Sequence, residues 1–257
     1  MCFDADSAPP VPHGPEALAR DHRITLTARD GTRFAAFEAV PENPSGLGVV
    51  ILPDVRGLYR FYIELARRFA ENGHHAVVVD YYGRTAGVGE RDADFPVDEH
   101  MVRLTPRGLY DDLSAAVAHL RSPEGGERRR IVTAGFCIGG RLAVLAGTKR
   151  AGHDLAGTVG FYCWPAPGPD GAPGPTQRAA ELTAPVLALM AGDDPGIPPG
   201  HVDAFARALA EAGIEHEVVV YPGAPHSFFD VKQGDHAAAS ADAWRRVLAF
   251  AGHAATG

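Results

Sequence analysis

Gly135-Phe136-Cys137-Ile138-Gly139-Gly140 is the stretch that decides the fold. An apolar run at 130–134 precedes it, and an apolar segment of helical character at 141–147 follows it. This pattern predicts a strand, a sharp turn flanked by glycines and a helix, with Cys137 at the bend. The glycines permit the strained backbone that exposes a nucleophile beside a helix N-terminus, where the helix dipole favours a thiolate. We therefore expect Cys137 to be a nucleophile, and the alternative is an unreactive cysteine buried at a tight turn.

Composition and charge are those of an ordinary globular protein with a small-molecule partner. The chain has 257 residues, 46% hydrophobic and 22% charged, and its net charge of -8 disfavours a nucleic acid as partner. No stretch reaches the roughly 18 apolar residues of a membrane span, and the first residues carry acids where a signal peptide carries bases. Cys2, Cys137 and Cys163 lack the spacing of a zinc site or a disulfide framework. We expect a cytoplasmic protein without a bound metal, and the sequence leaves the oligomeric state open.

The rest of the chain alternates short apolar runs with amphipathic segments. Residues 1–22 predict an extended, proline-rich arm before a single domain at 23–257. An antiparallel hairpin is expected around Asp30-Gly31, with strands at 24–27 and 32–40. Further strands are expected at 48–52, 76–79, 131–134, 155–162, 186–191 and 217–221, and helices at 61–72, 107–121, 137–148, 202–212 and 237–251. This alternation predicts an α/β fold in which helices cover both faces of a mostly parallel sheet.

Two stretches break the alternation and predict long loops. Residues 83–106 are strongly charged, and residues 165–175 are mostly proline, glycine and small residues. Long loops often line or cover a site, although a tolerated surface insertion explains the second loop equally well. Ligands of such sheets bind at the carboxyl ends of the strands.

An acid and a histidine follow two strands that come after the cysteine turn. Asp193 and Asp194 come directly after the strand at 186–191, and His226 lies in the loop after the last strand. The chain order nucleophile, acid, histidine is that of α/β hydrolases, in which the acid orients the histidine and the histidine activates the nucleophile. We expect a triad of Cys137, Asp194 and His226, with Asp193 as the less favoured acid. Alternatively, the aspartates cap a turn, and the histidine is an ordinary surface or core residue.

Acyl transfer also requires amide donors for the developing oxyanion. One donor should be the amide of Ile138, and the other should come from the loop after the strand at 48–52. That loop is Pro53-Asp54-Val55-Arg56-Gly57, and we assign the second donor to Val55. Asp54 is expected to influence the protonation of the thiol or, alternatively, to cap the loop.

These residues resemble the dienelactone hydrolase family, also called carboxymethylenebutenolidases, within the α/β-hydrolase fold. Besides the cysteine turn and the 53–57 loop, the matching motifs are Met1-Cys2-Phe3-Asp4, Asp80-Tyr81-Tyr82-Gly83-Arg84, Gly192-Asp193-Asp194-Pro195 and Pro225-His226-Ser227-Phe228. The resemblance covers nearly the whole chain. It implies a Cys137, His226 and Asp194 triad that opens a small lactone or ester through a thioester intermediate, with no metal or organic cofactor.

Two departures from the family concern the binding of substrate. Asp54 stands where the best-known members have the longer glutamate, and Phe228-Phe229-Asp230 stands where they have an arginine that binds the substrate carboxylate. An aspartate would instead repel an anionic substrate. Arginines of other loops could replace the missing one, and aromatic residues of the loops could line the pocket, although ordinary packing explains them as well. The candidate substrate-binding or neighbouring residues are Asp54, Arg56, Tyr59, Tyr82, Arg84, His100, Arg103, Trp164 and Phe228.

The sequence therefore predicts a cysteine-dependent hydrolase of a small lactone or carboxylic ester. A thioesterase or cyclase of a biosynthetic pathway would use the same triad, and the missing arginine permits it. In another class of function, the chain would be a non-catalytic ligand-binding protein or a redox sensor that uses Cys137 as an oxidisable thiol. The complete triad disfavours the binding protein, and no resolving cysteine is evident for the sensor, because Cys163 follows a different strand.

Overall fold

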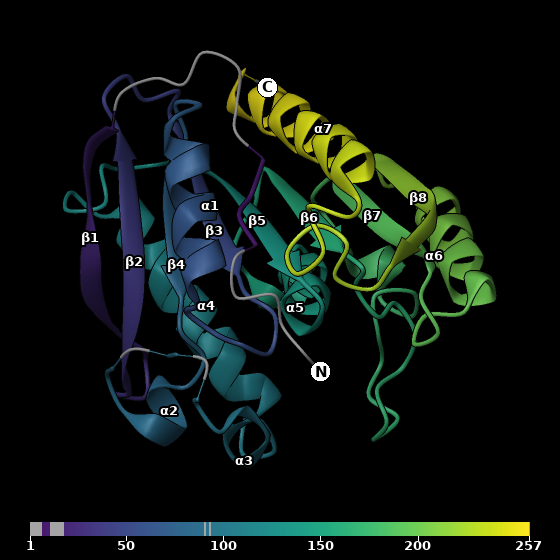
Figure 1. The fold of residues 1–257 in the computed structure, drawn as a ribbon, viewed down its shortest axis with the longest axis horizontal. Coiled ribbons are helices and arrows are strands. Elements are labelled where there is room, and N and C mark those ends of the chain that lie inside the picture. The colour runs from purple at the N-terminus through teal and green to yellow at the C-terminus, as the bar shows by residue number, and fades with distance from the viewer. Residues whose placement is uncertain (1–6, 11–17, 90, 93, 257) are drawn as a thin grey trace. The chain divides into compact units, whose positions relative to one another are not determined.

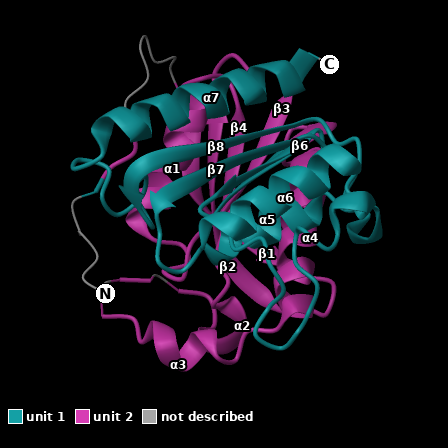
Figure 2. Cartoon of the chain, turned by 90° about the vertical axis from the view of Figure 1, so that its right-hand side faces the viewer, with its two compact units in different colours: residues 1–7, 132–257 teal, residues 8–131 magenta. Residues whose placement is uncertain are grey.

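The structure is a computed structural model that describes residues 7–10, 18–89, 91–92 and 94–256. The chain divides into two compact units, residues 1–7 with 132–257 and residues 8–131, which are coloured separately in Figure 2. The motif at residues 1–4 and most of the predicted arm lie outside the described residues. That residues 23–257 form one domain stays a prediction.

The unit of residues 8–131 is built on strands in the order β1–β2–β4–β3. The bounds are Leu18–Thr27 for β1, Arg33–Pro41 for β2, Leu47–Leu52 for β3 and His75–Val79 for β4. β1 and β2 form the predicted antiparallel hairpin, β2 also pairs antiparallel with β4, and β3 runs parallel to β4. β1 begins inside the predicted arm, because its first half is charged and mostly exposed and therefore lacks the apolar alternation that marks a strand.

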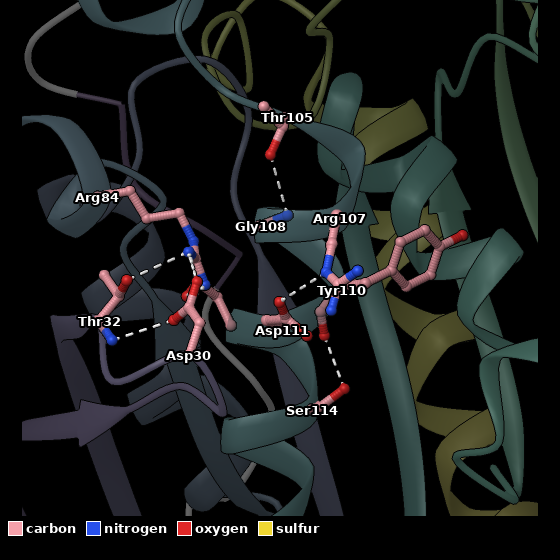
Figure 3. Close-up of polar contacts among 10 residues, drawn as sticks. Asp30, Thr32, Arg84, Thr105, Arg107, Gly108, Tyr110, Asp111 and Ser114 are labelled. Atoms are coloured by element: carbon pink, nitrogen blue, oxygen red, sulfur yellow. Dashed lines mark hydrogen bonds and ion pairs between the residues drawn. The ribbon is translucent and has the colours of Figure 1, made fainter.

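Helices cover both faces of these strands. α1 (Arg60–Ala70) lies in front of β3 and β4 in Figure 1, and α4 (Pro106–Arg121) lies behind them. α4 begins after Thr105, whose side chain accepts a hydrogen bond of 3.1 Å from the Gly108 amide (Figure 3), and proline stands in its first turn. The predicted loop at 83–106 also contains the short helices α2 (Gly83–Ala86) and α3 (Val97–Met101). Each is about one turn long, too short for a helical period to be visible in the sequence.

The unit that contains residues 132–257 is built on parallel strands in the order β5–β6–β7–β8. The bounds are Arg130–Phe136 for β5, Gly157–Phe161 for β6, Val186–Asp193 for β7 and His216–Pro225 for β8. α5 (Ile138–Ala146) and α6 (Pro199–Glu211) pack on one face, and α7 (Ala237–Thr256) packs on the other (Figures 1 and 2). Short 3-10 helices occupy Lys149–Ala151 and Ala179–Glu181.

The strands of both units confirm the predicted α/β architecture with a largely parallel arrangement. β3, β4 and β6 are buried along their whole length, which explains their continuous apolar runs. Residues 165–175 contain neither helix nor strand, as predicted for the second loop. None of the helices among the described residues is long and apolar enough to span a membrane.

Candidate active site

The cysteine turn, which we call the elbow (residues 135–140), joins the end of β5 to the start of α5. Cys137 has φ 55° and ψ -115°, a backbone conformation that costs energy for a residue with a side chain. Its amide donates a hydrogen bond of 3.1 Å to the carbonyl of Phe161, the last residue of β6. A Cβ added at Gly135 would lie 2.0 Å from the carbonyl oxygen of Gly139, and one at Gly140 would lie 2.8 Å from that of Phe161. Both positions therefore require glycine, and the predicted strand, turn and helix are confirmed.

The carboxylate of Asp194 and the ring of His226 are brought together by the ends of two neighbouring strands. Asp194 directly follows β7, and His226 directly follows β8. The Asp194 Oδ2 and His226 Nδ1 atoms are 2.6 Å apart, and the Gly196 amide donates to Oδ1 at 2.9 Å. The Asp194 side chain is 2% exposed and that of His226 is 35% exposed. Asp193 is exposed at the end of β7, so the geometry favours Asp194 as the partner of the histidine.

The Cys137 side chain is a second hydrogen-bonding partner of the His226 ring. Burial alone would lower the pKa of His226, but hydrogen bonding to Asp194 and to Cys137, with their negative charges, raises it to about 10. Burial alone would raise the pKa of Asp194, but the hydrogen bond and charge of His226 and the amides of Gly196 and Ile197 hold it below its usual range. This raised pKa favours the imidazolium form of the ring. Such an arrangement is suited to nucleophilic acyl chemistry.

The sequence analysis missed Tyr162, which directly follows β6. Its ring centroid lies 4.8 Å from that of His226, and its φ of 34° is unusual for a residue with a side chain. Ser227, beside the histidine, has φ 63°. Residues with positive φ thus follow the ends of β5, β6 and β8. Backbone strain of this kind is common at functional sites. The position of Tyr162 at a strand end beside the elbow was the only signal that could have indicated it.

The residues after His226 support the turn from the interior. Phe228 is fully buried and packs on Tyr162 and Tyr221 at ring-centroid distances of 5.7 and 5.0 Å, so it takes the packing role and is not exposed to a substrate. Asp230 is also fully buried. A repulsion between Asp230 and an anionic substrate stays a prediction. Trp164, by contrast, is half-buried, and its Nε1 donates to the Pro167 carbonyl at 2.8 Å.

Other predicted site residues gather around the 53–57 loop of the unit of residues 8–131. Asp54 and Arg56 form a buried ion pair in which Nε lies 2.9 Å from Oδ2 and 3.0 Å from Oδ1. The Arg56 guanidinium also lies 5.1 Å from the ring centroid of Tyr59. The buried Tyr82 hydroxyl donates to the Val55 carbonyl. Among the described residues, none accepts a hydrogen bond from the Val55 amide, so this donor is available within its own unit. Its predicted role as oxyanion donor stays a prediction.

Arg84 is held by partners within its own unit, and its role toward a substrate stays a prediction. Its guanidinium donates to both carboxylate oxygens of the buried Asp112, at 3.0 and 2.9 Å. It also donates to Asp30 and Thr32, as Figure 3 shows. A guanidinium shared by two carboxylates is already neutralised. Arg84 therefore ties the hairpin turn to α4 within its unit.

Two further candidates lie on or after α3 of the same unit. His100 stacks on Phe95 at a centroid distance of 4.8 Å and lies 6.2 Å from the Tyr82 ring. Arg103 is exposed in the turn after α3, where its amide donates to the His100 carbonyl at 3.1 Å. Within the described ranges, no group of three or more His, Cys, Asp or Glu side chains could hold a metal ion. A role of His100 or Arg103 toward substrate stays a prediction.

Comparisons with known proteins identify the family to which this chain is similar. The model of the "Dienelactone hydrolase family" matches residues 34–255. A "Putative carboxymethylenebutenolidase" of Yersinia pestis is 30% identical over 243 residues, which cover 87% of this chain and 85% of the relative. The "Carboxymethylenebutenolidase" of Rhodococcus opacus is 29% identical over 261 residues, which cover 97% of this chain and 96% of the relative. The solved structure of a "Putative Dienelactone Hydrolase" from Klebsiella pneumoniae has a TM-score of 0.73 and 26% identity, covering 90% of this chain and 98% of that one.

Proposed function

Because this chain belongs to the dienelactone hydrolase family and is a hydrolase of the ester and lactone class, we propose that it acts through a triad of Cys137, His226 and Asp194. The substrate is a small lactone or carboxylic ester, and the intermediate is a thioester on Cys137. The observation that carries this proposal is the chain of contacts from the Asp194 carboxylate to His226 Nδ1 at 2.6 Å, and from the same ring to the Cys137 side chain. All three residues follow strand ends of one unit.

In the first half of the reaction, the Cys137 sulfur attacks the carbonyl carbon of the substrate as a thiolate. The imidazolium of His226 then gives its proton to the leaving alkoxide as the C–O bond breaks, and in a lactone the resulting hydroxyl stays attached to the acyl group. The amide of Ile138, the first residue of α5, has no intrahelical acceptor and is available for the oxyanion. We propose Val55 as the second donor.

In the second half, the thioester is hydrolysed. The acylated sulfur carries no charge, so Cys137 no longer raises the pKa of His226, and the neutral ring accepts a proton from water. The resulting hydroxide attacks the thioester carbonyl, the C–S bond breaks, and the carboxylic product leaves. Thiolate and imidazolium are thereby restored. Asp194 stays ionised throughout and keeps Nδ1 of the ring in place.

The test is replacement of Cys137 with alanine, assayed on p-nitrophenyl acetate and on an aryl lactone. We expect kcat to fall on the order of 10⁴-fold or more, because the triad acts as a unit. The matched control is Cys163→Ala: this thiol is fully buried, burial raises its pKa to about 12, and it should be dispensable. Retained activity in Cys137→Ala would overturn the proposed mechanism. A panel that pairs lactones with acyl thioesters of equal acyl size would separate a lactonase from a thioesterase.

A further inference from the structure

Arg141 connects the helix of the nucleophile to the long loop that follows β6. It lies one helical turn after Cys137, whose carbonyl accepts the Arg141 amide at 3.1 Å. Its guanidinium donates to backbone carbonyls on both arms of that loop, at 3.0 Å for Trp164, 2.5 Å for Ala166, 3.4 Å for Ala172 and 3.5 Å for Pro173. The Arg141 side chain thus links the two arms of the loop to each other and to α5.

The loop, residues 164–175, is folded back on itself. The Gly168 amide donates to the Ala172 carbonyl at 2.8 Å, and the Thr176 amide donates to the Pro165 carbonyl at 3.0 Å. The two arms approach so closely that a Cβ at Gly174 would lie 2.1 Å from the Ala166 carbonyl oxygen. The prolines of this loop also restrict its backbone. The loop is therefore an ordered element that Arg141 holds against α5.

The loop begins next to the proposed triad. The Phe161 carbonyl, at the end of β6, holds the Cys137 amide, and the next residue, Tyr162, packs its ring 4.8 Å from that of His226. Trp164 follows two residues later as a half-buried residue, and its ring centroid lies 5.1 Å from that of His201 with the two planes nearly perpendicular. Both the backbone and the ring of Trp164 are held, because its backbone carbonyl accepts from Arg141 and its indole Nε1 donates to the Pro167 carbonyl.

We propose that Arg141 is a positioning residue for substrate selection: by fixing the 164–175 loop, it presents Trp164 as an apolar wall for esters that carry an aromatic group beside the reacting carbonyl. This inference rests on the proposed function, since Cys137 supplies the reacting sulfur. A planar guanidinium with five N–H donors can serve several carbonyls at once, whereas the three donors of a lysine ammonium spread from a single atom. Arg141→Lys should therefore restore little of the activity on aromatic esters that Arg141→Gln loses.

The kinetic test compares ethyl acetate, ethyl phenylacetate and benzyl acetate in a pH-stat assay. In Arg141→Gln, we expect kcat/KM for at least one aromatic ester to fall about tenfold through KM, the size of one lost aromatic contact. The value for ethyl acetate should stay within about threefold. The control is Arg246→Gln. It removes the same charge and the hydrogen bonds to Asp242 within α7 and to Glu217 on β8, far from this loop in sequence. It should leave the preference among the three esters unchanged.

A second readout is independent of catalysis. The chain has two tryptophans, so in a Trp244→Phe background all tryptophan fluorescence comes from Trp164. Arg141→Gln should increase acrylamide quenching of that fluorescence and speed proteolysis within 164–175, whether or not the enzyme turns over substrate. Gly174→Ala provides a variant that leaves α5 unchanged, and its clash with Ala166 should produce the same loss of aromatic preference.

The outcomes separate this inference from the proposed mechanism. If all three esters lose activity equally in Arg141→Gln and Gly174→Ala, or if none does, the selection role is overturned. If wild type and Cys137→Ala have equal activity, the triad proposal fails, and the quenching result still reports whether Arg141 fixes the loop. Unchanged quenching of Trp164 in Arg141→Gln would by itself refute the positioning role.

Discussion

Asp194 and Glu38 are buried carboxylates of different units, and both hold histidine rings. Asp194 lies 2.6 Å from Nδ1 of His226, whereas Glu38 Oε1 lies 2.9 Å from Nε2 of His75 and 2.8 Å from Nε2 of His119. Their surroundings differ. The His226 side chain is 35% exposed, while those of His75 and His119 are 1% and 15% exposed. Both sites therefore pair a histidine closely with a carboxylate, but only the His226 ring is substantially exposed to solvent.

The second difference is the further partner of each ring. His226 meets the Cys137 side chain on a strained elbow. His75, by contrast, accepts a hydrogen bond of 3.4 Å from Arg128 Nε at its remaining nitrogen. Glu38 lies on β2, His75 on β4 and His119 on α4, so this cluster cross-links three elements. The comparison teaches that the two histidine–carboxylate clusters differ in whether the ring also reaches a thiol and solvent, and this difference is what favours Asp194 and His226 as the candidate catalytic pair.

The largest expected effect is on kcat, which should depend on Asp194 and not on Glu38. Asp194→Asn should lower kcat on the order of 10³ to 10⁴-fold, because the amide no longer stabilises the imidazolium or selects the correct tautomer. Glu38→Gln should leave kcat per folded molecule unchanged. Steady-state rates, normalised by titration of active sites and measured well below the unfolding temperature, provide the check. Equal losses in the two variants would mean that Glu38 also serves catalysis and would break the comparison.

The second effect is on stability, and here Glu38 should dominate. Glu38→Gln leaves two histidines without their charged partner and should lower the free energy of unfolding by about 3 kcal/mol. Asp194→Asn should cost less, because the His226 ring is partly solvated. Urea unfolding monitored by circular dichroism measures both. If Asp194→Asn proved the more destabilising change, the triad would be a major structural element of its unit.

The pH dependence of the Glu38 contribution has a defined sign. Burial alone would raise the pKa of Glu38, but the hydrogen bonds of His119 and His75 outweigh it and hold the pKa well below the ordinary 4.5. The stabilisation is therefore complete above about pH 4.5 and is lost as the pH falls through the depressed value. The difference in unfolding free energy between wild type and Glu38→Gln should accordingly shrink only in acid.

The third effect concerns the charge of His226. Removing the sulfur in Cys137→Ala should lower the pKa of His226 from about 10, since hydrogen bonding and charge at Cys137 contribute to raising it. A histidine with a raised pKa stabilises the folded state fully below its ordinary 6.5, and this contribution disappears as the pH rises through about 10. NMR titration of the imidazole C–H resonances of wild type and Cys137→Ala measures the shift. An unchanged pKa would mean that Asp194 alone sets the charge.

Local pattern was enough to predict the elbow and the placement of Cys137, Asp194 and His226 after strand ends, because each depends on glycine spacing or on a polar residue directly after an apolar strand. Long-range pairing was not predictable. Arg84 meets Asp30 and Asp112, 54 and 28 positions away, so nothing near it in the sequence indicated that its charge was already neutralised. Arg141 binds backbone carbonyls, which have no sequence signature. The burial of Asp230 likewise depends on the packing of the whole unit.

The smallest expected effect tests whether the buried rings, rather than exposed cations, hold Glu38. Arg20 is 55% exposed, and its Nη2 lies 3.7 Å from Glu38 Oε2. Solvent screens such a pair, so Arg20→Gln should change the free energy of unfolding by no more than about 0.5 kcal/mol. His119→Gln is the matched comparison, because its ring donates to the same carboxylate from a largely buried position. If Arg20→Gln cost as much as His119→Gln in urea unfolding, and high salt abolished both costs, Glu38 would be a surface charge network and its contrast with Asp194 would fail.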